Sequence, residues 1–521
     1  MSSTVGTSST VGTSSPVATS STVRRRIADT AREVPGVPAL IGFDEGLAEN
    51  VLAWREFGTA VESAAQALRT ALDGDERPCV VVLAANTPAA ATGIAAALAA
   101  EVAVFPLNPG APQAERDALL RVLGRRFGAV HLLDDEQRPH RVELPHSDHP
   151  AHPDHPARPG GDVAYLLATG ASTGLPRISA RPGPLRYDAA RTPSLVIRQT
   201  GWRSGQRQLI AGPLYHAAPF TAFVDAILDR NTVVLAPFFS PQWTVELIRR
   251  YAVEWVQLTP AHMREILRGA DPDPADFASL RAVLHTAARC DADTKRGWIE
   301  LLGPERVYEL YGATEGIGVT LARGDEWLAR PGTTGRGVLT QVRVLDDRGA
   351  PVPPGTVGTV FMRTPQRVGL ADYLTGHAVR TTPDGFATVG DRGRLDRDGY
   401  LYLEPREHDI INVGGEKVDP DEVEAALRSH PAVVDAVAMA LPHQTLGSVV
   451  GAQVVLHPDV TVRRAELAAH CGRRLAGYKI PKQFTIVDKI PRTASGKTQR
   501  WRLTPDHPDD HPDHDGGATR Q

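Results

Sequence analysis

The stretch PCVVVLAANTPAAATGIAAALAAEVAVFPLNP, residues 78–109, decides the fold class. It holds a short β-branched run at 78–86, an Ala-rich segment at 87–100 and a second apolar run at 101–109. A strand, a helix and a strand in this order favour parallel strands joined by a crossover helix. The same rhythm returns over residues 231–260. The sequence therefore predicts an α/β protein with mixed or parallel sheets and packed helices.

Two later regions depart from this rhythm. Residues 342–364 contain strand-like runs separated by Gly and Pro turns, which predict a small antiparallel unit. After about residue 405 a new series of strand and helix patterns begins, and it continues to residue 475. A chain of 521 residues is also too long for one core. We expect a tail at 1–22, a large N-terminal domain at 23–405, a small mobile α+β domain at 406–504 and a tail at 505–521.

Both expected tails have biased compositions. Residues 1–22 repeat Ser/Thr-Val-Gly units, and residues 505–521 are rich in Pro, Asp and His, like the internal stretch 146–162. Pro at every third or fourth position prevents a fixed cage of metal ligands in the His/Asp tracts. We therefore expect disordered tails and a linker.

The bulk composition excludes several classes of protein. The 57 Lys and Arg residues nearly balance 61 Asp and Glu, and a net charge of -4 gives no support for nucleic-acid binding. Cys79, Cys290 and Cys471 are far apart, which argues against a disulfide framework or a thiolate zinc site and fits a reducing cytoplasm. No apolar run is suited to span a membrane. Frequent Ala, Arg, Gly and Pro suggest a bacterial source.

The segment YLLATGASTGLPRISA, residues 165–180, places small and hydroxyl residues where a strand should end. Such a loop exposes backbone N–H groups and hydroxyl donors, so it suits phosphate oxygens. The P-loop pattern requires Lys directly after its second Gly, whereas Leu175 follows Gly174. The Gly-Lys-Thr at 496–498 lacks the earlier Gly, because residue 491 is Pro. Neither segment is a P-loop.

Several segments together resemble the adenylate-forming (AMP-binding) superfamily, in its branch of acyl-CoA synthetases and bile-acid and fatty-acid CoA ligases. The resemblance covers roughly residues 25–503. The segments that carry it are TGASTGLPR (169–177), ELYGATEG (309–316), FATVGDRGRLDRDGYLYL (386–403), PREHDIINVGGEKVDPDEVE (405–424) and IPRTASGKTQR (490–500).

The resemblance implies ATP and Mg²⁺ as cofactors. It makes Glu315 the Mg²⁺ ligand, which suits a hard cation that keeps water and substrate phosphate in its other positions. Lys497, Glu315 and Thr314 become the catalytic residues, with Lys497 as a mobile ammonium that meets charge in the transition state. The implied nucleotide-binding residues are Thr169, Gly170, Ser172, Thr173, Gly174, Arg177, Tyr311, Gly312, Asp391 and Arg406. Asp391 would accept from the two ribose hydroxyls.

The remaining implied roles concern the small domain and the second substrate. His408 stands at the hinge, where the family often has Asp or Lys, and Arg177 replaces the Lys that usually ends the phosphate loop. Rotation of the small domain would bring a CoA-tunnel loop over the site, so that one site serves two half-reactions. That loop consists of Gly414, Gly415 and Lys417, beside Glu416.

Two shorter segments bear on the acid substrate. GPLYHAAPF (212–220) places His216 where acyl-CoA synthetases often have a residue near the acyl pocket and its gate, although a core histidine is the alternative. LHTAARC (284–290) resembles a small-residue strand end that contacts adenine and substrate.

These observations predict an ATP-dependent ligase that activates a carboxylic acid as acyl-adenylate, releases pyrophosphate and transfers the acyl group to the CoA thiol. Adenylation is needed because the oxide that a carboxylate would lose is a poor leaving group. Alternatives use the same adenylation with an amine, a carrier-protein thiol or an oxyacid such as nitrite, as in bacterial secondary metabolism. A non-catalytic nucleotide-binding homologue is the alternative of a different class. No nucleic-acid or membrane partner is expected.

Overall fold

A computed structural model of the chain describes residues 20–44, 46–134, 136–143, 163–169, 177–364, 379–405, 410–492, 498 and 503, with residues 169 and 177 described by their backbone alone. The stretches 146–162 and 505–521 lie outside these residues, as do residues 1–19. β1 (Ser21–Thr22) pairs antiparallel with β10 (Arg186–Tyr187), so regular structure starts two residues before the expected boundary at residue 23.

The first sheet combines parallel central strands with antiparallel edges. β4 pairs in parallel with β5 and β6, and β5 with β8, whereas β7 and β9 run antiparallel to their neighbours. The strands in spatial order are β7 (Pro139–Arg141), β6 (Ala129–Leu133), β4 (Pro78–Leu83), β5 (Ala103–Leu107), β8 (Val163–Thr169) and β9 (Arg177–Pro182). Residues 78–109 thus contain two parallel strands, as predicted.

The second sheet is larger and mostly parallel. Its strands β2, β12, β11, β13, β14 and β15 are parallel neighbours, and antiparallel strands extend both edges. The spatial order is β17 (Arg336–Gly337), β16 (Val319–Arg323), β15 (Val307–Gly312), β14 (Ala282–His285), β13 (Trp255–Leu258), β11 (Arg207–Ile210), β12 (Thr232–Leu235), β2 (Pro38–Phe43) and β3 (Glu49–Ala53).

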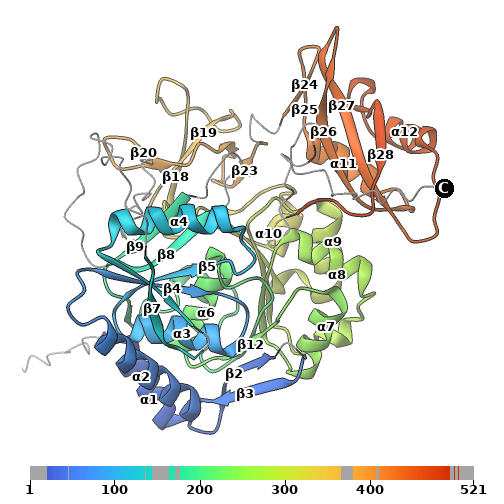
Figure 1. The fold of residues 1–521 in the computed structure, drawn as a ribbon. Coiled ribbons are helices and arrows are strands. Elements are labelled where there is room, and N and C mark those ends of the chain that lie inside the picture. Colours follow the sequence, from blue (N-terminus) through green and yellow to red (C-terminus); the bar gives the residue numbers. More distant parts are fainter. Residues whose placement is uncertain are drawn as a thin grey trace, which may run out of the picture.

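Helix α3 (Pro88–Ala99) shows how the sequence sets the local structure. Thr87 caps its start by accepting a hydrogen bond from the Ala90 N–H at 3.2 Å, and Pro88 occupies the first turn, where its missing N–H costs nothing. All its residues except Ala89 are buried. A helix that is apolar on every side belongs in the interior, and α3 lies between the two large sheets (Figure 1).

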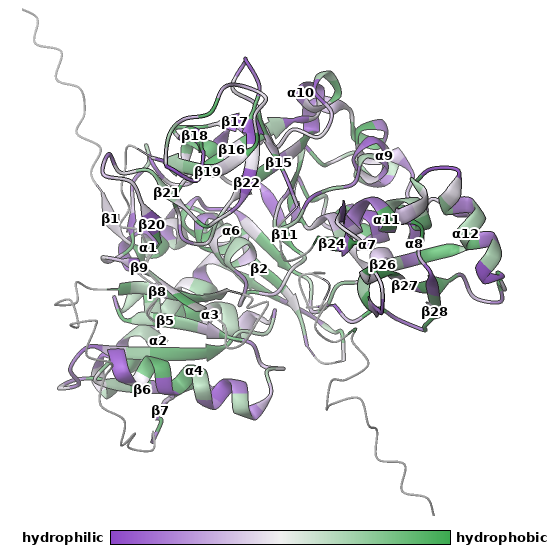
Figure 2. Cartoon of the chain, turned by 90° about the horizontal axis from the view of Figure 1, so that it is seen from above, coloured by the Kyte–Doolittle hydropathy of each residue, from purple (hydrophilic) through white to green (hydrophobic). Residues whose placement is uncertain are grey.

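The helices form layers around the two sheets. One face of the second sheet shares a core with helices α1, α2, α3 and α6 and with the first sheet, while helices α7, α8 and α9 cover its opposite face. Helix α4 covers the outer face of the first sheet. Strands β5 and β8 are hydrophobic in Figure 2, and α4 turns hydrophilic residues outward. The helices of the large domain are α1 (Val23–Glu33), α2 (Trp54–Ala71), α4 (Gln113–Arg126), α5 (Leu195–Arg198), α6 (Ala217–Leu228), α7 (Pro241–Arg250), α8 (Pro260–Gly269), α9 (Ala292–Leu302) and α10 (Gly324–Ala329).

A third sheet corresponds to the small antiparallel unit. β18 (Gln341–Leu345) and β19 (Gly358–Arg363) form the antiparallel pair predicted for residues 342–364. The other strands are β20 (Arg380–Thr381), β21 (Ala387–Thr388), β22 (Arg392–Leu395) and β23 (Leu401–Leu403).

The C-terminal part has its own sheet and its own apolar core. The long hairpin β26–β27 dominates it, and β28 joins β27 in parallel. Its elements are β24 (Ile411–Val413), β25 (Glu416–Val418), α11 (Pro420–Arg428), β26 (Val433–His443), β27 (Gly447–Leu456), α12 (Arg464–Gly472) and β28 (Gln483–Ile486). This unit stands apart from the sheets of the large domain and above helices α8 and α9 (Figure 1), in agreement with the α/β fold class and the small α+β domain that the sequence predicts.

Candidate active site

The turn between β15 and β16 presents two of the predicted catalytic residues. The strands pair antiparallel, with Gly312 opposite Val319. The Gly316 N–H closes the turn by donating to the Ala313 carbonyl at 2.9 Å, and Gly316 has a φ of 64°, which glycine adopts without strain. Thr314 and Glu315 are half-buried in this turn. A hydroxyl and a carboxylate therefore stand side by side at the end of β15.

A hydrogen bond joins this strand to the third sheet. The Tyr311 hydroxyl donates to Asp391 Oδ2 at 2.8 Å. Asp391 lies between β21 and β22, and its carbonyl accepts from the Val360 N–H at 2.8 Å. The two residues are 80 positions apart in the chain. The structure thus brings together Tyr311, which the family resemblance assigns with Gly312 to the adenine pocket, and Asp391, which it assigns to the ribose.

The adjacent Gly312 packs closely against the partner strand. A Cβ at this position would lie 2.8 Å from Val319 Cγ1, so a side chain there would have to displace the Val319 side chain. Two acidic residues farther along the predicted ribose segment, Asp396 and Asp398, lie in the turn between β22 and β23. Asp396 accepts from the backbone N–H groups of Asp398 and Tyr400, both at 2.9 Å.

Aromatic and imidazole side chains gather where adjacent strands of the second sheet end. His216 follows β11 and occupies the position just before α6, without a side-chain capping hydrogen bond, while His262 lies in the first turn of α8, after β13. Burial, with a smaller contribution from His216, lowers the pKa of His262 to about 4. His262 stacks on Phe239, which follows β12, with ring centroids 4.0 Å apart. Carboxyl ends of parallel strands are where open α/β sheets bind ligands.

The next strand ends in the segment LHTAARC. β14 ends at His285, which is fully buried, and burial lowers the pKa of this histidine well below its usual range. Ala287, two residues later, has a φ of 80°, an uncommon backbone conformation for a residue with a side chain. The small-residue segment therefore bends two residues after the end of β14.

Sequence reasoning missed Asn86, which ties these strand ends together. Its side-chain amide donates to the carbonyls of Gly212 at 3.0 Å and Ala236 at 2.9 Å, and its oxygen accepts from the Leu214 N–H at 2.9 Å. Asn86 lies just after β4, so it links the first sheet to the loop that carries His216. The only sequence signal was an Asn directly before a Thr-Pro helix start.

The predicted CoA-tunnel loop is a tight hairpin of the small domain. β24 and β25 pair antiparallel around Gly414 and Gly415, whose φ angles are 57° and 96°. A two-residue hairpin turn with positive φ at both central residues is a type I′ turn, in which glycine is favoured. Lys417 is exposed on β25.

Several predicted site residues lie outside the described residues. They are Gly170, Ser172, Thr173, Gly174, Arg406, His408 and Lys497. For the phosphate loop, the backbone of its flanking residues is described, and Thr169 pairs with Arg177 across β8 and β9. For the Lys497 segment, the Arg492 guanidinium donates to Thr498 Oγ1 at 2.9 Å and forms an ion pair with Asp435 at 2.7 Å.

The residues present fit a Mg²⁺ ion that is shared with a nucleotide. In the described ranges, no group of three or more His, Cys, Asp or Glu side chains is arranged to bind a metal by itself. Mg²⁺ usually takes one or two carboxylates and completes its shell with substrate phosphates and water. Glu315, half-buried beside Thr314, matches that requirement.

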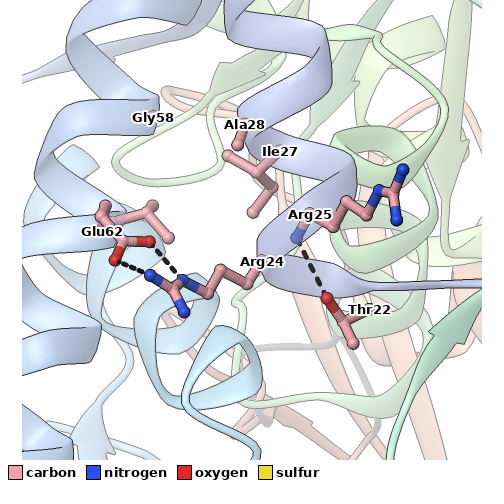
Figure 3. Close-up of a pocket in the computed structure, with 8 residues that line it drawn as sticks. Thr22, Arg24, Arg25, Ile27, Ala28, Gly58 and Glu62 are labelled. Atoms are coloured by element: carbon pink, nitrogen blue, oxygen red, sulfur yellow. Dashed lines mark hydrogen bonds and ion pairs between the residues drawn. The ribbon is translucent and has the colours of Figure 1, made fainter.

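A pocket elsewhere on the molecule is unrelated to these residues. It lies between α1 and α2, where Arg24 forms an ion pair with Glu62 and Ile27 and Val61 supply apolar surface (Figure 3). None of the predicted site residues lines it. We therefore assign no function to this pocket.

Comparison with known proteins identifies the family. The chain matches the AMP-binding enzyme family over residues 27–369 and the AMP-binding enzyme C-terminal domain over residues 422–497, and it belongs to this family. The resemblance inferred from the motifs is confirmed, and the chain is an AMP-forming ligase of the acid–thiol type.

Individual relatives differ in their substrates. The chain is 29% identical over 393 residues to fatty acid–[acyl-carrier-protein] ligase ScoC of Streptomyces coeruleorubidus, covering 73% of this chain and 72% of the relative. It is 31% identical to sulfoacetate–CoA ligase of Cupriavidus necator, covering 65% of this chain and 66% of the relative. The o-succinylbenzoate CoA synthetase of Bacillus subtilis, solved with ATP and magnesium, has the same fold, with a TM-score of 0.71 at 24% identity over 93% of this chain and all of that one.

All three cysteines are free. Among the described residues, no helix is long and apolar enough to cross a membrane.

Proposed function

We propose that the protein activates a carboxylic acid with ATP as an acyl-adenylate and then transfers the acyl group to the thiol of CoA. The observation that carries the proposal is the hydrogen bond between Tyr311 and Asp391 beside the Thr314–Glu315 turn. It unites a candidate ribose acceptor, a candidate adenine neighbour and a candidate metal ligand at one strand end. Sulfoacetate–CoA ligase among the relatives supports CoA as the acceptor.

The nucleotide is held by groups from two sheets. Asp391 accepts hydrogen bonds from the ribose hydroxyls, and Tyr311 holds its carboxylate in place from one side. Glu315 would hold Mg²⁺, which would offset the charge of the phosphates when bound, and the Bacillus subtilis relative that was solved with ATP and magnesium supports this ion. Thr314 contacts phosphate, and the loop from Thr169 to Arg177 holds the phosphates that depart as pyrophosphate. Arg406 gives the second ribose or phosphate contact.

The acid lies at the ends of the parallel strands, near His216. Lys497 approaches both the carboxylate and the α-phosphate, where an ammonium stabilises the charge that develops in the transition state. In the second half-reaction the small domain, residues 406–504, turns about His408 relative to the large domain, residues 23–405. The Gly414–Gly415 hairpin with Lys417 then lines the path of the thiol. The cytoplasmic location expected from the cysteine usage completes the proposal.

The acceptor is open to a specific alternative. The Streptomyces coeruleorubidus relative is a ligase for an acyl carrier protein, so a carrier-protein thiol is the second candidate. Both acceptors are thiols, and the adenylating half-reaction is the same. Comparing CoA with a carrier protein after adenylation distinguishes them.

ATP–pyrophosphate exchange with Mg²⁺ tests the first half-reaction. Fatty, aryl, cinnamic and steroidal acids, and nitrite, are offered in turn, and we expect exchange that depends on one class of acid. Asp391→Ala should reduce that exchange at least hundredfold, because the ribose loses its acceptor. Asp398→Ala, in the neighbouring exposed turn, is the matched control and should retain activity. ATP binding without exchange for any acid would contradict the proposal and favour a non-catalytic homologue.

A further inference from the structure

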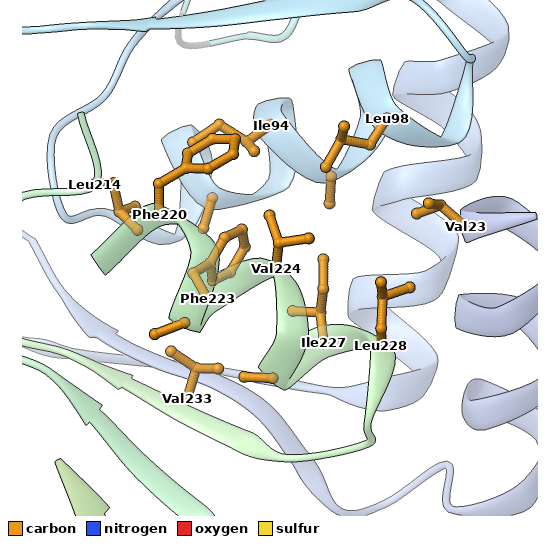
Figure 4. Close-up of a cluster of buried hydrophobic side chains, with 14 of the residues drawn as sticks. Val23, Ile94, Leu98, Leu214, Phe220, Phe223, Val224, Ile227, Leu228 and Val233 are labelled. Atoms are coloured by element: carbon orange, nitrogen blue, oxygen red, sulfur yellow. The ribbon is translucent and has the colours of Figure 1, made fainter. Parts of the chain in front are cut away.

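Helix α6 is central in the large domain, and most of its surface is covered. Phe220, Phe223 and Val224 are buried, as are Ile227 and Leu228 (Figure 4). These side chains pack toward Ile94 and Leu98 of α3 and toward Val233 of β12. This apolar packing fixes the helix between the two large sheets.

One stripe of the same helix departs from this pattern. Ala217, Ala218 and Pro219 in its first turn are partly accessible, and so are Thr221 and Asp225 farther along, although the chain neighbours of these last two residues are buried. Positions i, i+3 and i+7 lie on one face of a helix, so Ala218, Thr221 and Asp225 form a continuous line. Accessible area this deep in the domain means that the line faces open space rather than packed protein. The line starts two residues after His216, which directly precedes the helix.

The carboxylate at the inner end of this line is unusual. Burial raises the pKa of Asp225 to about 7, with Arg181 and Arg198 opposing the shift and Asp229 adding to it. Within the part of the chain that the structure describes, no hydrogen bond reaches the Asp225 carboxylate. A polar group at such depth without a partner requires an explanation.

Asp229, one turn farther along the sequence, is a nearby carboxylate that does have a hydrogen-bond partner. It is buried and accepts a hydrogen bond from Trp202 Nε1 at 2.8 Å. The protein therefore provides a hydrogen-bond donor for the Asp229 carboxylate and leaves the Asp225 carboxylate open toward the accessible stripe. A donor group on a bound substrate would supply the hydrogen bond that Asp225 lacks.

We propose that Asp225 determines acid specificity by accepting a hydrogen bond from a neutral hydroxyl or amino group at the end of the substrate remote from its reacting carboxylate. The inference rests on the proposed function, because it places the acid along α6 below His216. Seven residues of helix separate Ala218 from Asp225, a distance of about 10 Å. That span suits a rigid aryl acid with a donor on its far side.

The charges around Asp225 select a neutral donor. A second carboxylate on the acid would meet Asp225 and Asp229, which repel it. A cationic group would meet Arg181 and Arg198, the two charges that lower the pKa of Asp225. A hydroxyl or an uncharged aryl amine avoids both conflicts and supplies the missing hydrogen bond.

The test compares acids that differ only in the donor. Cinnamate, 4-hydroxycinnamate and 4-aminocinnamate are measured by ATP–pyrophosphate exchange, together with octanoate and 8-hydroxyoctanoate. We expect kcat/KM to favour the acid with the donor at least about tenfold over its parent, because a site that is built around a hydrogen bond rejects the analogue that lacks it. Asp225→Leu should bring the ratio to about one, whereas Asp225→Asn keeps an acceptor and should retain the preference.

Asp229→Asn is the matched control, since it removes a neighbouring carboxylate that already has a partner. It should leave the ratio between acids unchanged even where it lowers stability. Retention of the ratio in Asp225→Leu, or highest activity with an acid that has no remote donor, would overturn the inference while the proposed function stands. Absence of exchange with every acid would contradict the proposed function, and the inference would fall with it.

Discussion

The interior of the large domain and its boundary with the small domain are built from different interactions. In the interior, Trp298 of α9 is fully buried, packs on Phe277 and donates to the Met263 carbonyl at 2.9 Å. At the boundary, the exposed Arg268 of α8 donates to the carbonyls of Arg428 and Val434, and Arg289 forms an ion pair with Asp419 at 3.2 Å.

This difference has a mechanical consequence. Apolar packing is specific to one arrangement and is lost when the parts separate, because interiors are close-packed. Exposed guanidinium groups exchange a carbonyl for water at little net cost, and exposed ion pairs contribute about 0–1 kcal/mol. A boundary of this kind holds the small domain in place and also allows it to turn, as the proposed two half-reactions require.

The largest expected effect is in the interior. Trp298→Ala should lower the free energy of unfolding of the large domain by about 4 kcal/mol, because it removes a buried ring and leaves a cavity. Urea unfolding followed by circular dichroism measures the loss. Leu328→Ala, at a side chain that is 46% exposed, is the control and should change little. A comparable loss in both variants would remove the distinction between interior and surface.

A buried ion pair tests whether the loss of one charged partner costs more stability inside the domain than at the boundary. Lys295 of α9 forms an ion pair with Glu309 of β15, and both side chains are buried. Lys295→Met should cost about 3 kcal/mol, because Glu309 is left without its partner in the interior. Combining Lys295→Met with Glu309→Leu should recover most of the loss. A double variant no more stable than the single one would contradict this account.

The pH dependence of stability sharpens the same contrast. His262 has a pKa of about 4 in the folded state, against an ordinary value of about 6.5. As the pH falls, His262 is protonated in the unfolded chain before it is protonated in the folded chain. The free energy of unfolding should therefore decrease as the pH drops from 6.5 toward 4, by about 2 kcal/mol at pH 5. In His262→Phe, which keeps a ring against Phe239, this part of the slope should vanish. If the free energy of unfolding of His262→Phe depended on pH as that of the unmodified protein does, burial would not lower the pKa of His262.

The smallest effect is expected at the boundary. Arg268→Ala should change the free energy of unfolding of either domain by less than about 1 kcal/mol, because water replaces the two carbonyls around an exposed guanidinium. Denaturant unfolding and scattering profiles would measure stability and domain arrangement together. A loss above 3 kcal/mol would mean that this boundary behaves like a core.

Much of this architecture could be predicted from local patterns. Residues 78–109 formed the expected strand, helix and strand, and residues 342–364 formed the expected antiparallel pair. The motifs also indicated the family correctly, because Gly, Thr and acidic residues at fixed spacing are local features of the chain. The roles of the individual site residues remain predictions.

Asn86 and Asp225 could not be found in this way. Asn86 connects loops more than a hundred positions away, and the meaning of Asp225 depends on the missing partner of its carboxylate. Both properties arise only when distant segments pack.

The sequence by itself determined the strand, helix and strand of residues 78–109, the antiparallel pair of residues 342–364 and the family motifs. Periodicity, caps and backbone preferences act over a few residues and therefore remain visible in the chain. Only the tertiary structure decided that Tyr311 meets Asp391, and that Thr221 and Asp225 stay partly accessible between buried neighbours on α6. Those features depend on contacts between distant segments, which local patterns do not encode.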